Sequence, residues 1–173
     1  MGKVTLSVRR LSASSRRGIL ELGQFRWLCA LGRSGISARK REGDGATPRG
    51  TYRVIRAYYR PDKFFRTRCS LPQQPIRPHD GWCDAPTDRN YNRQVRLPYS
   101  ASAERLWRAD GLYDVVLAMD YNLSPRLRGR GSAIFLHVAK AGYEPTEGCV
   151  AVAKRDLRLL MSRLPKGAKL VIR

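Results

Sequence analysis

Three kinds of signal are missing or scarce in this sequence of 173 residues. No apolar run approaches the ~18 residues that a membrane-spanning helix needs; the longest runs are 115–119 and 133–136. The N-terminal segment is basic, but it has no apolar stretch long enough for a secretory signal. We therefore expect a chain without a transmembrane segment and without a signal-peptide export route.

Cysteines are few and widely separated. The four lie at positions 29, 69, 83 and 149 and form no CxxC pair, which excludes a zinc ribbon or a thioredoxin-type motif. The spacing is also unlike that of a small disulfide-stapled secreted domain. Each cysteine is by default a small buried apolar side chain. A Cys69–Cys83 disulfide in an oxidising compartment stays an open alternative.

Acidic residues are scarce as well. Against 14 Asp and Glu stand 34 Lys and Arg, which gives a formal net charge of +20. Such a charge indicates an anionic partner: nucleic acid, an anionic envelope polymer or a carboxylate-rich substrate. The basic residues are scattered, and the densest clusters are 39–41 and the group Arg126, Arg128 and Arg130. Because neither cluster is a long basic block, the charge alone does not select among these partners.

The composition that is present indicates a folded β-rich domain. Apolar residues make up 42% of the chain and aromatic residues 9%, which excludes a disordered basic tail. The length allows one domain with its own core. Fifteen Gly and ten Pro, spread along the chain, favour many short strands and turns over a helical bundle.

The pattern of apolar residues predicts the individual elements. Strands are expected over 4–8, 18–23, 25–31, 52–59, 112–119, 132–139, 149–152 and 168–172, with 18–23 and 25–31 forming a hairpin. A short helix is expected over 101–109. A second is expected over 155–164, where apolar side chains recur at helical spacing. The sequence thus predicts one mainly β domain with one or two short helices.

Residues 61–98 differ from the rest of the chain in composition. Five prolines fall between Pro72 and Pro98, and Trp82 and Tyr91 lie among them. A flexible linker would not carry such aromatic side chains, so we interpret the segment as a long ordered loop. Loops of this length inside a compact domain are usually functional or lid-like.

The stretch 134–150 is the most informative about chemistry. His137 interrupts an apolar strand, and Cys149 follows Gly148 after a connection of about ten residues. A return of that length can bring the imidazole beside the thiol, where it favours the thiolate that attacks. Gly148 allows close approach of a substrate carbonyl, and backbone N–H groups at this point can stabilise an oxyanion.

Two other interpretations of these residues stay open. A buried His–Cys pair without catalytic function is the commoner arrangement. A zinc site is also conceivable, because His and Cys both ligate zinc, although the spacing does not favour it; its ligands would be His79, Cys83, His137 and Cys149.

The stretch resembles the catalytic motif of the L,D-transpeptidase family, also called YkuD or ErfK. That motif is a His on a strand, followed after a loop by [Ser/Thr]-His-Gly-Cys, a hydrophobic residue and Asn or Arg. Here Thr146-Glu147-Gly148-Cys149-Val150-Ala151 occupies it, with Glu147 replacing the His and Ala151 replacing Asn or Arg. Residues 47–52 resemble the family's Thr-Pro-x-Gly-x-Tyr/Phe turn. The Pro-rich segment resembles that of a short proteobacterial branch.

The resemblance implies one β-sandwich-like L,D-transpeptidase domain over 1–173, with an insertion at about 61–98. It implies a cysteine acyltransferase acting on peptidoglycan stem peptides, with Cys149 as nucleophile and His137 as proton carrier. Gly148 and Thr146 would serve the oxyanion or orient the imidazole. The candidate substrate-binding residues are Glu147, Tyr143, Arg126, Arg128, Arg130 and Trp82.

The departures from the motif leave the reaction's second half open. Attack on the thioester by a stem amine would form a cross-link, whereas attack by water would make the enzyme an L,D-carboxypeptidase. The resemblance implies no cofactor and no metal, a monomer, and muropeptides rather than nucleic acid as partners. This function favours the periplasm or cell wall, while the missing signal peptide leaves the cytoplasm possible. A basic nucleic-acid-binding module is the alternative from another class.

Overall fold

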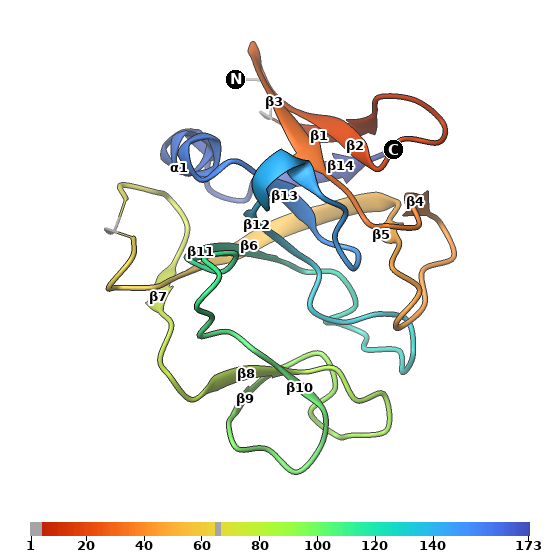
Figure 1. Cartoon of the computed structure of the whole chain (residues 1–173), viewed down its shortest axis with the longest axis vertical. Coiled ribbons are helices and arrows are strands. Elements are labelled where there is room, and N and C mark those ends of the chain that lie inside the picture. The colour runs from red at the N-terminus through yellow and green to blue at the C-terminus, as the bar shows by residue number, and fades with distance from the viewer. Residues whose placement is uncertain (1–4, 65–66) are drawn as a thin grey trace.

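The computed structural model describes residues 5–64 and 67–173 and shows a single mainly β domain, as predicted (Figure 1). The helical elements are the 3-10 helix η1 (Ala141–Tyr143) and the α-helix α1 (Lys154–Arg163). The strands are β1 (Thr5–Arg10), β2 (Arg17–Leu22), β3 (Phe25–Ala30), β4 (Ile36–Ser37), β5 (Thr47–Pro48), β6 (Gly50–Tyr59), β7 (Gln73–Pro75), β8 (Asp80–Cys83), β9 (Gln94–Arg96), β10 (Ala103–Arg105), β11 (Val115–Met119), β12 (Phe135–Val138), β13 (Val150–Val152) and β14 (Lys169–Ile172).

The main sheet closes on itself. Its nine strands follow the order β11-β12-β13-β3-β2-β1-β14-β6-β7, and β11 also pairs with β6. The long strand β6 makes this possible, because its first residues pair with β14 and its later residues pair with β11 and β7. The extra pairing leaves eight strands in a ring, with β7 added beside β6.

The predicted hairpin, the strand over 52–59 and the C-terminal helix and strand are all present. The predicted first strand begins at Val4, which lies outside the described residues. The helix predicted over 101–109 is wrong, because this stretch forms the short strand β10 paired with β8. An isolated helix of nine residues is marginal in water, whereas the strand pairing buries Leu106.

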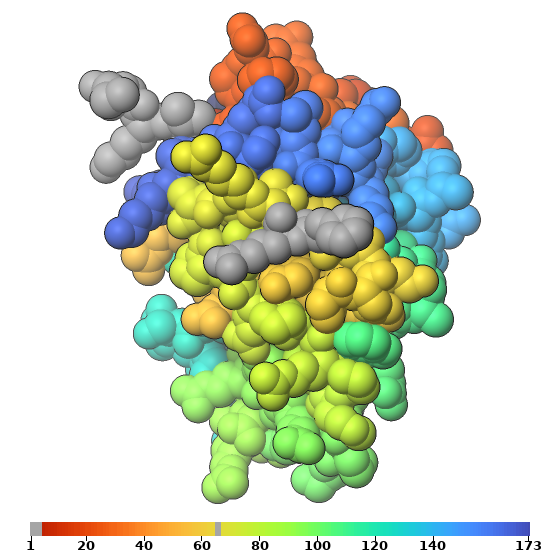
Figure 2. All heavy atoms as spheres, turned by 90° about the vertical axis from the view of Figure 1, so that its left-hand side faces the viewer, coloured from red at the N-terminus to blue at the C-terminus, as the bar shows by residue number. Residues whose placement is uncertain are grey.

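Segment 61–98 is more regular than the predicted loop. It contains β7, β8 and β9, and the last two join β10 in a separate sheet of order β10-β8-β9. This small sheet lies at the end of the molecule away from the β2–β3 hairpin and the C-terminus (Figure 1). In the space-filling view the segment runs down one side of the molecule to that end (Figure 2). Residues 65–66 of this segment lie outside the described residues.

The apolar run of β11 is explained by burial on both of its faces. Val115, Leu117 and Met119 join the core that also holds the apolar face of α1, whereas Val116 and Ala118 point the other way, into a second cluster. Alternate residues of a strand face opposite sides of a sheet. A strand covered on both sides is therefore continuously apolar.

The second cluster lies between the main sheet and the small sheet. Trp82 of β8 packs edge-on against Phe135 of β12, with ring centroids 5.1 Å apart. Cys149 belongs to the same cluster. The small sheet therefore covers the face of the main sheet on which Cys149 lies. Nowhere in the described ranges is a helix long and apolar enough to cross a membrane.

Candidate active site

Adjacent parallel strands place Cys149 and His137 on one face. Strands β12 and β13 pair with Leu136 opposite Val150 and His137 opposite Ala151. Leu136 and Val150 point into the main core, so the residues next to them point outward. The outward set consists of Phe135, His137, Cys149 and Ala151, of which the last three line one cavity.

Two backbone groups hold the thiol of Cys149. Its Sγ accepts a hydrogen bond from the Phe135 N–H at 3.3 Å and donates one to the Ala133 carbonyl at 3.2 Å. The residue is 8% exposed. Burial raises the pKa of the thiol to about 12, and the charge of Glu104 acts in the same direction. The resting nucleophile is therefore a neutral thiol.

The imidazole of His137 is fixed in one tautomer. Its Nδ1 lies 2.8 Å from the carbonyl oxygen of Val138. A carbonyl oxygen only accepts, so in this contact Nδ1 carries the proton and the neutral ring keeps its lone pair on Nε2. Burial lowers the pKa of His137 to about 4. The Tyr113 ring lies edge-on to the imidazole at 5.2 Å. His137 is therefore a neutral base that can accept a proton at Nε2.

Thr146 orients the cysteine loop rather than the imidazole. Its Oγ1 donates to the Cys149 carbonyl at 2.6 Å and accepts from the Gly148 N–H at 3.1 Å. Its own backbone is held by Leu31 and Arg33. The Gly148 amide, predicted to face an oxyanion, is thus already engaged by the Thr146 hydroxyl.

Gly148 is required by its surroundings. Its φ is +135°, a conformation that side chains rarely adopt, and a Cβ there would lie 2.8 Å from the Ala46 carbonyl oxygen. Ala46 directly precedes the turn at 47–52, and Thr47 of that turn accepts a hydrogen bond from the Gly32 N–H at 2.8 Å. The turn that resembled a family motif thus packs behind the cysteine loop.

The cavity that holds Cys149 and His137 has a volume of about 500 Å³. Its lining is more acidic than the chain as a whole. Two basic residues line it, Arg108 and Lys140. Five acidic residues line it, and they are Glu42, Asp84, Glu104, Glu144 and Glu147. The charged side chains of the cavity lining are therefore mostly negative, although the whole chain has a net charge of +20.

Of the predicted substrate-binding residues, Glu147 lines this cavity. Its carboxylate pairs with Arg33 at 2.8 Å, and its side chain is 78% exposed, so it lies at the rim. Tyr143 lies on η1 and does not line the cavity. Trp82 is buried and donates its indole N–H to Asn92 at 2.9 Å. Trp82 therefore anchors the small sheet and is not among the residues that line the cavity.

The three arginines of the 126–130 loop also lie outside the cavity lining. Arg126 donates to the Tyr91 carbonyl at 3.0 Å. Arg130 lines a separate hollow with Tyr121 and Asn122. The structure therefore places these cations outside the cavity that holds Cys149 and His137.

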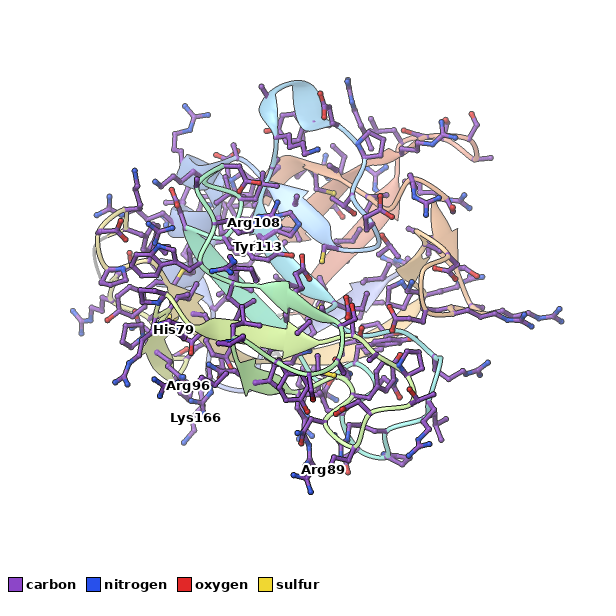
Figure 3. All side chains as sticks on the ribbon, turned by 60° about the horizontal axis from the view of Figure 1, so that its bottom comes forward. His79, Arg89, Arg96, Arg108, Tyr113 and Lys166 are labelled. Carbon is purple, nitrogen blue, oxygen red and sulfur yellow. The ribbon has the colours of Figure 1, made fainter. Side chains whose placement is uncertain are left out.

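The zinc alternative has no support in the geometry. Within the described residues, no group of three or more His, Cys, Asp and Glu side chains is placed to hold a metal ion. His79, one of its ligands, lies away from Arg108 and Tyr113, which lie together near the cavity (Figure 3). All four cysteines are free thiols, so Cys69 and Cys83 are not paired in this structure.

Sequence reasoning missed several residues around the thiol. Glu104 and Tyr113 line the cavity and are joined by a 2.6 Å hydrogen bond from the Tyr113 hydroxyl. Ser132 and Asp84 also line it. Glu104 was hidden by the wrong helix prediction, and the others belong to no motif. Of these residues, only Asp84 lies in a distinctive stretch of sequence. It ends the run Asp80-Gly81-Trp82-Cys83-Asp84 in the Pro-rich segment.

Comparison with known proteins adds one finding. Residues 11–172 match the family model of the L,D-transpeptidase catalytic domain, YkuD. No curated protein and no solved structure matched the chain.

Proposed function

Because the chain belongs to the L,D-transpeptidase catalytic domain family, we propose that it cross-links peptidoglycan stem peptides through a thioester on Cys149. The observation that carries the proposal is the paired placement of thiol and base. Cys149 and His137 line one cavity, and the Val138 carbonyl favours the tautomer with the proton on Nδ1 and the lone pair on Nε2 of His137. A nucleophile, a base and an orienting acceptor are the parts that cysteine acyl transfer requires.

Acylation starts from the neutral pair. As Sγ of Cys149 attacks the carbonyl carbon of an L-centre, Nε2 of His137 takes the thiol proton. The carbon–sulfur bond forms and the carbonyl electrons move to oxygen. Collapse of this intermediate breaks the peptide bond, and the imidazolium gives its proton to the departing D-amino acid. The backbone N–H of Cys149 is the proposed oxyanion donor, because that of Gly148 is engaged by Thr146.

Burial has a direct consequence for this step. Separate charges on sulfur and imidazole are unfavourable because both side chains are buried. The ion pair therefore forms only as the carbon–sulfur bond forms, and the Phe135 N–H, 3.3 Å from Sγ, stabilises the negative charge that develops there.

The second half-reaction decides the product. An acceptor amine attacks the thioester carbon, and Nε2 of His137 takes its extra proton. The carbon–sulfur bond then breaks as the new peptide bond is completed, and the imidazolium returns the proton to the sulfur of Cys149. Water in place of the amine gives a trimmed stem, which is carboxypeptidase activity. A cross-linking enzyme meets polymeric wall outside the cytoplasmic membrane, so we place the activity in the periplasm or cell wall.

We also propose that segment 61–98 is an insertion that roofs the site. Asp84 from this segment lines the cavity, and Trp82 packs over the β12 face that carries His137. This gives the Pro-rich segment the role of a fixed wall.

Incubation with a disaccharide tetrapeptide, followed by mass spectrometry of the products, tests the proposal. We expect cross-linked dimers and a thioester adduct on Cys149. Cys149→Ala should abolish both, while Cys29→Ala, at an equally buried thiol, should keep both. Tripeptide plus free D-Ala without dimers would favour carboxypeptidase activity instead. Full activity in Cys149→Ala, or salt-sensitive nucleic-acid binding as the sole activity, would refute the proposal.

A further inference from the structure

One wall of the cavity carries three carboxylates, of which two have no ion-pair partner among the described residues. Asp84 follows β8, Glu104 lies on β10, and Glu42 lies in the loop between β4 and β5. Across the described ranges, neither Asp84 nor Glu42 forms an ion pair. Glu104 lies 3.8 Å from Arg108, but that guanidinium makes a closer contact of 2.5 Å with Asp110. The other two cavity acids, at the exposed rim, are each paired with a base.

The three carboxylates influence one another. Burial raises the pKa of Glu104, and the negative charges of Asp84 and Glu42 raise it further. Glu104 also contributes to the raised pKa of Cys149. The charge of Glu104 therefore reaches the nucleophile, while those of Asp84 and Glu42 act on Glu104.

Two buried polar atoms on the same cavity have no partner. Oδ1 of Asp84 and Oγ of Ser132 are both shielded from solvent and make no hydrogen bond with the described residues. Ser132 is 7% exposed and lines the cavity with Asp84. A buried polar atom left unpaired destabilises the folded protein. Such atoms in a cavity wall indicate a ligand that supplies hydrogen-bond donors.

The geometry separates two kinds of cation. A metal ion needs several ligands converging on one point, and no acidic group among the described residues is so arranged. An ammonium group instead directs its hydrogen bonds outward to acceptors that lie apart. The carboxylate and hydroxyl oxygens on this cavity come from separate residues, which suits an ammonium group better than a metal ion.

We propose that Glu42, Asp84, Glu104 and Ser132 form a subsite for a primary ammonium group of the substrate. This proposal rests on the proposed function, because the role of the subsite is to orient the stem peptide relative to Cys149. The ammonium belongs either to the side chain of a diamino acid in the acyl donor or to the acceptor amine before it is deprotonated. The chemistry recognised is the same in both cases, and two arms of one experiment distinguish the sources.

The donor arm compares two stem tetrapeptides, one ending in Lys-D-Ala and one ending in Nε-acetyl-Lys-D-Ala. Acylation of Cys149 is followed by intact-protein mass spectrometry without an acceptor. We expect roughly tenfold faster acylation by the charged peptide, the size expected for one hydrogen bond between charged groups. Asp84→Asn keeps the shape of the side chain and should reduce this preference several-fold, as should Ser132→Ala. Glu21→Gln on β2 removes the same charge far from the cavity and should leave the preference unchanged.

The acceptor arm starts from acyl-enzyme made with the neutral donor. Free lysine or Nα-acetyl-lysine methyl ester is added, and the ratio of amine capture to hydrolysis is measured. A fall of this ratio in Asp84→Asn, without a change in the donor arm, assigns the subsite to the acceptor. A change confined to the donor arm assigns it to the diamino acid. No change in either arm would overturn the proposal.

Equilibrium binding separates failure of the subsite from failure of the proposed function. The two tetrapeptides are titrated into Cys149→Ala, which cannot react. Tighter binding of the charged peptide, lost in Cys149→Ala/Asp84→Asn, supports the subsite even if no peptide acylates the wild-type enzyme. Equal binding of both peptides would overturn the subsite, whatever the reaction proves to be.

Discussion

The side-chain oxygen of Asn92 accepts a hydrogen bond from the Ala133 amide at 3.0 Å, and the Ala133 carbonyl in turn accepts the thiol proton of Cys149 at 3.2 Å. The same Asn92 oxygen accepts the indole N–H of Trp82. Its Nδ2 donates to the carbonyls of Tyr121 and Asn122. A single buried amide thus joins the small sheet, the 121–131 loop and the residue that positions the nucleophile.

Replacing Asn92 should weaken both the fold and the chemistry. In Asn92→Ala, the amide of Ala133 and the indole of Trp82 lose their acceptor while buried, at a cost of about 1–3 kcal/mol each. Urea unfolding should show a loss of roughly 2–5 kcal/mol, and the acylation rate of the still-folded protein should fall. Asn90→Ala, in the same segment, is the matched control and should cost under about 1 kcal/mol. Equal stability of the two variants would contradict this role for Asn92.

The cysteine loop offers a test of backbone placement. In Gly148→Ala, the new Cβ would lie 2.8 Å from the Ala46 carbonyl oxygen, so the loop that carries Cys149 must shift. We expect a drop of about 100-fold or more in kcat/KM, the cost of misplacing a reacting group by about 1 Å. Gly142→Ala also has a positive φ, of +70°, but its Cβ meets open space. It should lose about 1 kcal/mol of stability and keep most activity.

Thiol alkylation reports on whether the resting pair is neutral. Because the pKa of Cys149 is raised to about 12 and that of His137 is lowered to about 4, little thiolate exists at pH 7. The rate of Cys149 alkylation by iodoacetamide should therefore be slow at pH 7 and rise steadily to pH 10. A rate that is already at a plateau between pH 6 and 8 would show a thiolate–imidazolium pair and contradict the neutral mechanism.

The buried imidazole also makes stability depend on pH. Its folded pKa of about 4 lies below the ordinary value of 6.5, so between these values the unfolded chain binds a proton that the folded protein does not. This contribution is fully present above pH 6.5 and is lost as the pH falls toward 4, by up to about 3 kcal/mol. Denaturant unfolding at pH 7 and pH 4.5 should show a smaller acid loss in His137→Asn than in wild type. An identical acid loss in both proteins would refute this.

Replacing the arginines of the 126–130 loop should have little effect on a soluble substrate. Arg126, Arg128 and Arg130 do not line the cavity, so replacing all three by Gln should leave KM for a soluble tetrapeptide within about twofold, as for residues without substrate contact. Co-sedimentation with whole anionic peptidoglycan should weaken, because long-range attraction depends on the number of surface cations. A large rise in KM for the soluble peptide would restore the role that sequence analysis gave these residues.

The elements that sequence analysis located best have strong local patterns. The helix α1 carries apolar residues at helical spacing, and the 18–31 hairpin carries two apolar strands around one turn. The motif around Cys149 was visible because its spacing to His137 is short. The helix expected over 101–109 failed because its local preference was overridden by pairing with β8, a partner distant in sequence.

The three carboxylates on the cavity wall could not be predicted from the sequence, for a related reason. Glu42, Asp84 and Glu104 come from three separate segments, and only the fold brings them to one cavity. Asn92 likewise acts through contacts with Trp82 and Ala133, which nothing local to Asn92 predicts. Residues whose role lies in a long-range contact leave no periodicity or spacing in the sequence.

The contrast between the net charge of +20 and the mostly acidic cavity lining has a further consequence. A stem peptide is dipolar, with carboxylates along its length and an ammonium on a diamino side chain. Near this protein, such a molecule experiences a torque as well as an attraction, since cations outside hold its carboxylates while the cavity draws its ammonium inward. The electrostatic field therefore turns the diamino side chain of the peptide toward the cavity before any contact with Cys149 is made.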